Sequence, residues 1–215
     1  MLFRSINDFL TPIFHIDSVK NSEITTKVYE ECIPVISKYE TEISQNENIY
    51  NALINIQSKG NSSLNNIQNK VLENEIRDFK LSGCHLEIDK KKRLEEISLR
   101  LSELSHKFSQ NLLNATNAFE MIIDNFEDVK EVPASDLELA KFEEEGVTKY
   151  KFTLQMPSYL AYITYGTKRE KREEIYKAYC TKASENGKII EEILAFKNEK
   201  VKILGVDSYA QYSLT

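Results

Sequence analysis

The stretch "DKKKRLEEISLRLSELSHKFSQNLLNATNAFE", residues 89–120, decides the fold class of this chain. Its apolar residues recur every three or four positions, which is the period of one helix face; they are Leu94, Ile97, Leu101, Leu104, Phe108, Leu112, Ala115 and Phe119. At about 1.5 Å of rise per residue, this helix is a rod of roughly 48 Å. A helix of that length buries its apolar face only along neighbouring helices, so the stretch predicts a helical bundle or array.

The residues before this stretch also follow helical periods. They predict a helix from Leu2 to Ile16, which Pro12 ends or bends, and a second helix that Ser22 caps and Pro34 kinks. The expected buried face of the second helix is Ile24, Val28, Cys32, Val35, Ile36, Tyr39 and Ile43. A short helix around residues 49–56 follows, then a break at "SKGNSS" (58–63), then a helix over residues 64–79 with Gly83 as its C-terminal cap.

The C-terminal residues predict three more helices. Thr167 and Glu170 form the capping-box pattern T-x-x-E for a helix through Ala183, and a further helix over 190–204 closes at Gly205. Asp207 and Ser208 then look like the start of another helix, so we expect the sequence to stop inside an element.

One stretch, "YKFTLQMPSYLAYITYG" (150–166), departs from the helical pattern. Apolar and polar residues alternate from Tyr150 to Met156, which predicts a strand whose buried face is Tyr150, Phe152, Leu154 and Met156. "MIID" (121–124) is its natural antiparallel partner, and "PASDLELAKFEEEG" (133–146) reads as a short capped helix. The fold class is therefore mainly α: an elongated helical bundle or array with one small antiparallel β-ribbon, in a single helical region over residues 1–215.

Three tyrosines follow this strand at a spacing of three residues. Tyr159, Tyr162 and Tyr165 could be packed core, a platform that stacks bases, or part of a wall that faces an extended ligand. Core packing is the more common role of tyrosines at this spacing.

Composition excludes several classes of function. The formal net charge is -6 and the basic runs "DKKKR" and "TKREKREE" have acidic residues among or after them, so nucleic-acid binding is disfavoured. No window is apolar over the length that a membrane span needs. The three cysteines are far apart and accompany no signal peptide, which favours reduced thiols in a cytoplasm.

The residues alone give no catalytic motif. There is no H-E-x-x-H, C-x-x-C or G-x-S-x-G, no glycine-rich phosphate loop, and the close Cys84 and His85 pair falls short of a zinc site. The paired carboxylates lie on charged helix faces, where solvated surface is the simpler interpretation. By this reasoning the chain is a helical module without its own catalytic or metal-binding residues.

Four blocks, taken in order, resemble the oligopeptidase A branch of the thimet oligopeptidase family of zinc metallopeptidases. They begin "FHIDSVKNSEITTKVYEECIPVISKYE", "LENEIRDFKLSGCHLEIDKKKRLEEIS", "FTLQMPSYLAYITYGTKREKREEIYKAYCTKAS" and "EEILAFKNEKVKILGVDSYAQYSL", and together they cover nearly the whole chain. The resemblance implies a cytosolic metalloendopeptidase that cuts short peptides with one zinc, bound by the histidines of H-E-x-x-H and a downstream glutamate. Those residues are not in this sequence, so no catalytic or metal-binding role is carried onto it.

The resemblance also has departures and consequences for the site. Family members have a helical segment before the part that matches Leu2, and usually a Gly/Asn-rich insertion where this chain runs from "ASENG" into "KIIEEIL". The family's N-terminal helices form one side of a channel that admits peptides, so Tyr159, Tyr162 and Tyr165 become candidates for channel-adjacent residues. The leading interpretation is a partial chain that encloses substrate, is inactive alone and self-associates in the absence of the catalytic domain; the rival is a stand-alone helical module that binds a peptide or a partner protein.

Overall fold

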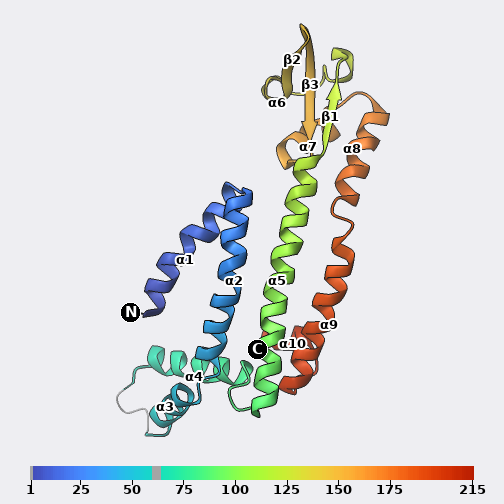
Figure 1. Cartoon of the computed structure of the whole chain (residues 1–215). Helices are drawn as coiled ribbons and strands as arrows, with labels where there is room; N and C mark the ends of the chain where they lie inside the picture. The colour runs from blue at the N-terminus through green and yellow to red at the C-terminus, as the bar shows by residue number, and fades with distance from the viewer. Residues whose placement is uncertain (1, 60–63) are drawn as a thin grey trace. The chain divides into compact units, whose positions relative to one another are not determined.

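The structure, a computed structural model, describes residues 2–59 and 64–215, without the side chains of residues 2–5 and 7. The predicted break at "SKGNSS" lies mostly outside these residues. The chain forms two compact units: unit 1 runs to Ser105 and resumes with Glu191–Thr215, and unit 2 is His106–Ile190 (Figure 1). The prediction of a mainly α fold with a small antiparallel sheet is confirmed.

Unit 1 begins with four helices: α1 (Leu2–Val19), α2 (Glu23–Ser44), α3 (Glu47–Ser58) and α4 (Asn66–Leu81). Helix α1 runs through Pro12 to Val19, so the proline does not end it. The Ser22 cap of α2 is confirmed, because the Ser22 side chain accepts from the Thr25 N–H at 3.2 Å and the Ser22 N–H donates to Thr25 Oγ1 at 2.9 Å. These reciprocal bonds satisfy two donors at the start of the helix.

The predicted buried face of α2 is partly wrong. Ile24, which is 77% exposed, Val28 and Val35 are on the surface, and the two buried residues of the helix are Ile33 and Ser37. The other predicted residues are half-buried: Cys32, Ile36, Tyr39 and Ile43. Apolar periodicity identified the helix but not the side that is most covered.

The end of α4 is a Schellman motif, as the glycine predicted. Gly83 has a φ of +79°, its N–H donates to Lys80 O, and the Cys84 N–H donates to Phe79 O at 3.2 Å. This geometry turns the chain so that the buried Cys84 joins the interior of unit 1. The other buried hydrophobic residues of unit 1 are Ile33, Leu72, Ile76, Phe79, Leu94, Ile97, Leu104 and Val201.

Two long helices contribute to both units. They are α5 (Ile88–Ala118), which confirms the predicted long helix, and α9 (Asn186–Leu204). Within unit 1, Arg93 Nε donates to Glu199 Oε1 at 2.6 Å, and Arg100 Nε donates to Glu192 Oε1 at 2.8 Å. Gly205 ends α9 with a φ of +72°, and Ser208 caps α10 (Tyr209–Leu214) as predicted.

Unit 2 carries a three-stranded antiparallel sheet in the order β1-β3-β2: β1 (Glu120–Ile123), β2 (Lys141–Glu144) and β3 (Val147–Thr153). The predicted pairing of the first and last strands is confirmed, with Met121 opposite Phe152. The expected helix over 133–146 is only α6 (Ala134–Ala140), because the next four residues form β2. Glu145 and Gly146 both have positive φ, which is the two-residue hairpin turn that matches the twist of the strands.

Helix α7 (Met156–Tyr165) corrects the predicted strand. Tyr150, Phe152 and Leu154 are buried as expected, but Met156 is 50% exposed because the helix begins there, with Pro157 in its first turn. The buried cluster of unit 2 combines the sheet with α7 and α8 (Arg169–Thr181); it includes Met121, Ile123, Val129, Phe152, Leu154, Tyr159, Tyr162 and Ile175.

The predicted capping box of α8 is also wrong. The Thr167 hydroxyl donates to Glu127 O at 2.7 Å, and the N-cap residue is Lys168, which makes no side-chain cap. Residue 127 belongs to a short 3₁₀ turn, η2 (Phe126–Asp128), so a contact distant in sequence takes the hydroxyl that a local cap would use. The helix ends at Thr181, before Ala183, whose φ is +53°.

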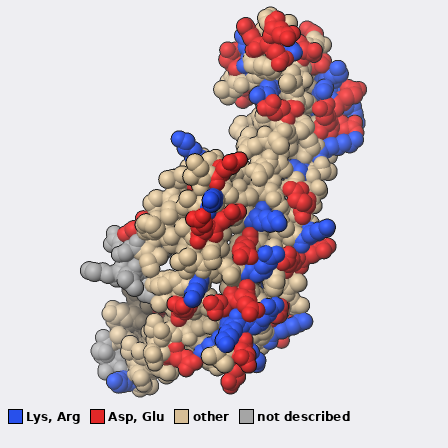
Figure 2. Space-filling view, viewed as in Figure 1, with Lys and Arg blue, Asp and Glu red and all other residues tan. Residues whose placement is uncertain are grey.

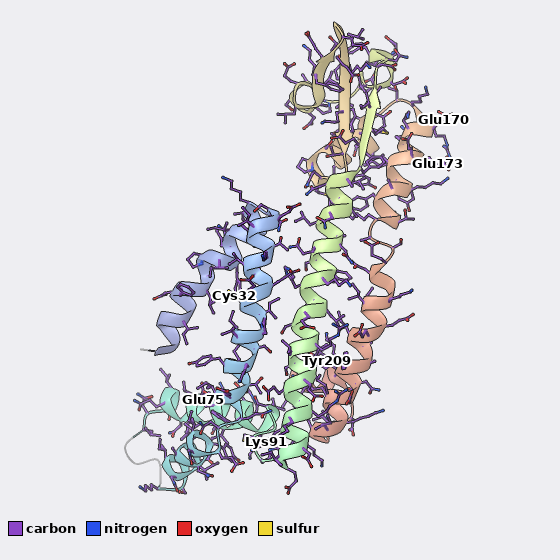
Figure 3. All side chains as sticks on the ribbon, viewed as in Figure 1. Cys32, Glu75, Lys91, Glu170, Glu173 and Tyr209 are labelled. Carbon is purple, nitrogen blue, oxygen red and sulfur yellow. The ribbon has the colours of Figure 1, made fainter. Side chains whose placement is uncertain are left out.

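The surface intermixes charges of both signs. Lys and Arg alternate with Asp and Glu on the face in Figure 2. On α8 the exposed Glu173 pairs with Lys177 at 2.5 Å, and Figure 3 shows Glu170 and Glu173 on this helix. Within residues 2–59 and 64–215, no helix combines the length and apolarity that crossing a bilayer requires.

Candidate functional site

The three candidate tyrosines have different environments on α7. Tyr159 is buried and stacks on Tyr179 with ring centroids 4.0 Å apart and planes 15° apart. The Lys182 ammonium lies 3.9 Å from the Tyr179 centroid, which adds a cation–π contact. Tyr162 is fully buried, whereas Tyr165 is 47% exposed. Of the three, Tyr165 therefore presents the most side-chain surface.

Tyr162 is a core residue with an unusual hydroxyl. Its ring packs 4.7 Å from the Phe152 ring, and its hydroxyl has no hydrogen-bond partner among the described residues. The pKa of Tyr162 is raised to about 12, mainly by burial and to a smaller extent by the negative charge of Asp128, which the positive charge of Arg172 opposes. The phenol is thus held neutral in an apolar setting.

A groove of about 390 Å³ lies beside the same helix, within unit 2. Its lining comes from α6, β2, β3 and the start of α7, which contributes Pro157, Ser158 and Ala161. The three tyrosines are not among its lining residues. Residues 150–166 therefore do face a groove, and the residues that α7 contributes to it have small side chains, which leave room for an occupant.

Polar groups are arranged around this groove. Ser158 Oγ accepts from the Thr153 N–H at 2.9 Å, and Gln155 Nε2 donates to Asn117 Oδ1 at 2.6 Å. Lys151 is paired with Glu120 at 3.0 Å, whereas Lys141 has no ion-pair partner among the described residues. The groove thus offers an apolar floor with a free ammonium group in its lining, which suits binding rather than bond cleavage.

A metal site and a reactive thiol each place requirements on the described residues. Across residues 2–59 and 64–215 no three His, Cys, Asp or Glu side chains lie close enough to hold a metal ion. Cys32, visible on α2 in Figure 3, is half-buried, Cys84 is buried and Cys180 is exposed. Burial raises the pKa of the Cys84 thiol, which lowers its reactivity at neutral pH.

Sequence reasoning missed the groove residues and placed its emphasis on the tyrosines. Pro157 lies in the first turn of α7, and Ser158 and Ala161 lie three residues apart on that helix, so they share one face. Small residues on one helix face leave space beside the helix. The spacing of Ser158 and Ala161 would therefore have predicted a groove if the start of α7 had been predicted correctly.

Comparisons with known proteins give the chain relatives over nearly all its length. Residues 5–92 match the family model described as "Neurolysin/Thimet oligopeptidase, N-terminal domain". The chain is 40% identical to a Haemophilus influenzae protein named "Oligopeptidase A", over 97% of this chain and 32% of that protein. The Escherichia coli protein of the same name is 38% identical, over 95% of this chain and 32% of that protein. A "Probable cytosolic oligopeptidase A" from Arabidopsis thaliana is 34% identical, over 94% and 31%.

Fold and alignments together describe a mainly helical domain of the kind found at the N-terminal side of proteins named oligopeptidases. The chain belongs to the neurolysin and thimet oligopeptidase family, which confirms the resemblance drawn from its four sequence blocks. It spans about a third of the length of the curated relatives that it matches.

Proposed function

We propose that this chain is the substrate-enclosing helical part of a cytoplasmic zinc metalloendopeptidase that hydrolyses short peptides. The observation that carries the proposal is the 40% identity to a protein named oligopeptidase A over 97% of the chain. The likeness extends through both units rather than residing in one short motif. A relative named as cytosolic supports the compartment.

The described residues of this chain do not fit the zinc site that the proposed enzyme requires. A catalytic zinc needs three protein ligands and an open coordination position, where it activates a water molecule. The described residues include no such cluster, so we assign them no step of zinc chemistry. We expect the 215-residue polypeptide by itself neither to cleave peptides nor to retain zinc.

The contribution that we propose for this chain is binding and enclosure. The groove beside α7 has small side chains from Ser158 and Ala161 and an unpaired Lys141, which suit the backbone and a carboxylate of an extended peptide. Tyr165 is the member of the tyrosine row with enough exposed surface to contact a ligand. Tyr159 and Tyr162, both buried, would support that surface from below.

The test compares the 215-residue chain with a full-length protein that includes it. Both are assayed with a quenched fluorescent peptide and with a folded protein substrate, with and without a metal chelator. We expect chelator-sensitive cleavage of the peptide by the full-length protein alone. Absence of that cleavage would overturn the peptidase proposal, and cleavage by the pure chain would overturn its expected inactivity.

Two variants of the full-length protein test the enclosure role, one in the groove lining and one on the exposed end of the tyrosine row. Lys141→Glu and Tyr165→Ala should raise KM for peptides, since both change exposed groups proposed to meet substrate. Tyr176→Ala is the matched control, because Tyr176 is an exposed tyrosine on α8 that belongs to neither the groove lining nor the tyrosine row. Unchanged KM in both test variants would remove the enclosure role while leaving the peptidase proposal intact.

A stand-alone helical interaction module is the second candidate. The exposed apolar surface of unit 1, where Ile24, Val35 and Ile67 are all largely uncovered, decides between the two, because the rest of a larger enzyme would cover such a surface and a stand-alone module would not. Light scattering and a hydrophobic dye separate the two proposals. An enclosing part of a larger enzyme should self-associate and bind the dye when isolated, whereas a monomeric, dye-silent chain would favour the module.

A further inference from the structure

Unit 1 contains a second cavity, whose lining differs in kind from that of the groove. It measures about 180 Å³ and lies among α2, the end of α4, α5, α9 and α10. Six of its lining residues are serines or threonines: Ser37, Thr41, Ser44, Ser82, Ser98 and Ser102. We call it the hydroxyl cavity. Interiors between helices are ordinarily apolar, so this lining requires an explanation.

Four of these hydroxyls already use their protons within their own segments. Thr41 donates to Ser37 O at 2.8 Å, Ser44 to Thr41 O at 3.2 Å, and Ser102 to Ser98 O at 3.1 Å. Ser82 likewise donates to Asp78 O at 2.9 Å. Each of these oxygens can therefore offer only lone pairs to the cavity, and acts there as an acceptor.

Two hydroxyls remain as donors. Ser37 is only 8% exposed, lines the cavity, and its hydroxyl has no hydrogen-bond partner among the described residues. The Ser98 hydroxyl, on α5, also has no partner there. Both hydroxyls are therefore available to donate to a hydrogen-bond acceptor that enters the cavity.

The cavity lining also carries one charge of each sign. The Lys200 ammonium lies 4.8 Å from the Tyr212 ring centroid, and it forms no ion pair with any described residue. Glu40, on α2, likewise has no ion-pair partner among the described residues. The hydroxyl cavity thus combines donors with an ammonium group, and acceptors with a carboxylate.

We propose that the hydroxyl cavity binds a small zwitterion that carries a carboxylate and an ammonium group, namely a free α-amino acid. The Glu40 carboxylate would repel an inorganic anion, and the Lys200 ammonium would repel a metal cation. An apolar molecule would leave the hydroxyls without hydrogen-bond partners. The volume suits a small amino acid rather than a longer peptide. This inference stands apart from the proposed peptidase activity and does not rest on it.

In the binding test, L-alanine is titrated into the purified chain and binding is measured by calorimetry. Acetate, alaninamide and N-acetylalanine each lack one of the two charges. L-Alanine should bind saturably, and each analogue should bind at least about tenfold more weakly, because it leaves one charged group of the cavity unpaired. Equal binding of any analogue would overturn the proposal, and so would an L-alanine titration without saturation, which would mean a water-filled cavity.

Variants of the chain then test which charged residue of the cavity binds which charged group of the amino acid. Lys200→Gln should make L-alanine and alaninamide bind alike, and Glu40→Gln should make L-alanine and N-acetylalanine bind alike; a merely structural role would not produce these paired losses. Ser37→Ala should weaken the binding of L-alanine by about tenfold. The matched controls are the exposed Lys202→Gln, Glu31→Gln and Ser18→Ala, outside the cavity lining. Binding that is unchanged in Lys200→Gln and Glu40→Gln would overturn the assignment.

Discussion

Units 1 and 2 form their cores from different elements and different kinds of residue. In unit 2, a three-stranded sheet and two helices surround a cluster that includes the large side chains of Met121, Phe152 and Tyr162. In unit 1, helices keep apolar residues such as Ile24 and Val35 on the surface, while Ser37 points inward. The difference teaches that apolar periodicity predicts a helix reliably, whereas its covered side depends on what the rest of the protein supplies.

The largest expected effect is in the core of unit 2. Phe152→Ala removes a side chain that is 1% exposed and should lower the free energy of unfolding by about 3–5 kcal/mol. Thr153→Ala, on the next position of the same strand, should cost little. Chemical denaturation measures both, and similar losses for the two variants would contradict the assignment of faces to β3.

The second prediction concerns alkaline pH. The folded state raises the pKa of Tyr162 from 10.0 to about 12, so it holds the phenol proton more tightly than the unfolded chain does. The resulting stability is present below pH 10.0 and is lost as the pH rises through about 12; it amounts to at most about 3 kcal/mol.

Tyr162→Phe should make this alkaline loss smaller, as measured by denaturation at several pH values. At neutral pH the variant should keep or gain stability, because the Tyr162 hydroxyl has no partner among the described residues. Tyr165→Phe, at an exposed position, is the control and should change neither quantity. A loss of about 1 kcal/mol in Tyr162→Phe at neutral pH would reveal a hydrogen bond, contrary to this account.

Two glycine substitutions compare a closely packed helix end in unit 1 with an open helix start in unit 2. A Cβ at Gly83 would lie 2.7 Å from Leu94 Cδ1 on a backbone with φ of +79°, so Gly83→Ala should cost about 2 kcal/mol. Gly187→Ala, in the first turn of α9 with open space around it, should instead stabilise by about 0.5–1 kcal/mol. Thermal unfolding distinguishes the opposite signs, and a loss in both variants would refute the distinction.

The smallest effect is expected at a helix end. Ser22→Ala removes the cap of α2 and should cost about 1 kcal/mol. Ser18→Ala, which removes an exposed hydroxyl that bonds His15 O, should change stability by less than about 0.5 kcal/mol. If the two variants have equal stability, the capping bonds of Ser22 contribute nothing measurable.

Local signals allowed much of the fold to be predicted. Ser22, Gly83, Gly205 and Ser208 each fix a helix end through bonds to nearby backbone, so sequence spacing is sufficient. The failures involve distant partners. Thr167 bonds Glu127 rather than capping α8, and "KFEE" becomes β2 because β3 provides its pairing, although its charged residues read as a helix tail.

The candidate sites were harder to predict than the fold. The groove uses Pro157, Ser158 and Ala161, whose contribution is the space that their small side chains leave. The hydroxyl cavity combines residues of five elements, and only the repeated spacing of Ser37, Thr41 and Ser44, and of Ser98 and Ser102, marks it in the sequence. Convergence of separate helices is a tertiary property, so no single stretch encodes it.

The hairpin turn at Glu145 and Gly146 has a consequence for the order of folding. Strands β2 and β3 are joined by two residues, whereas β1 is separated from β3 by more than twenty, so the entropy lost on closing the chain is much smaller for the hairpin. The hairpin should therefore form first and present β3 as a template on which β1 adds later. Substitutions in the turn would then slow folding, while substitutions in β1 would mainly speed unfolding.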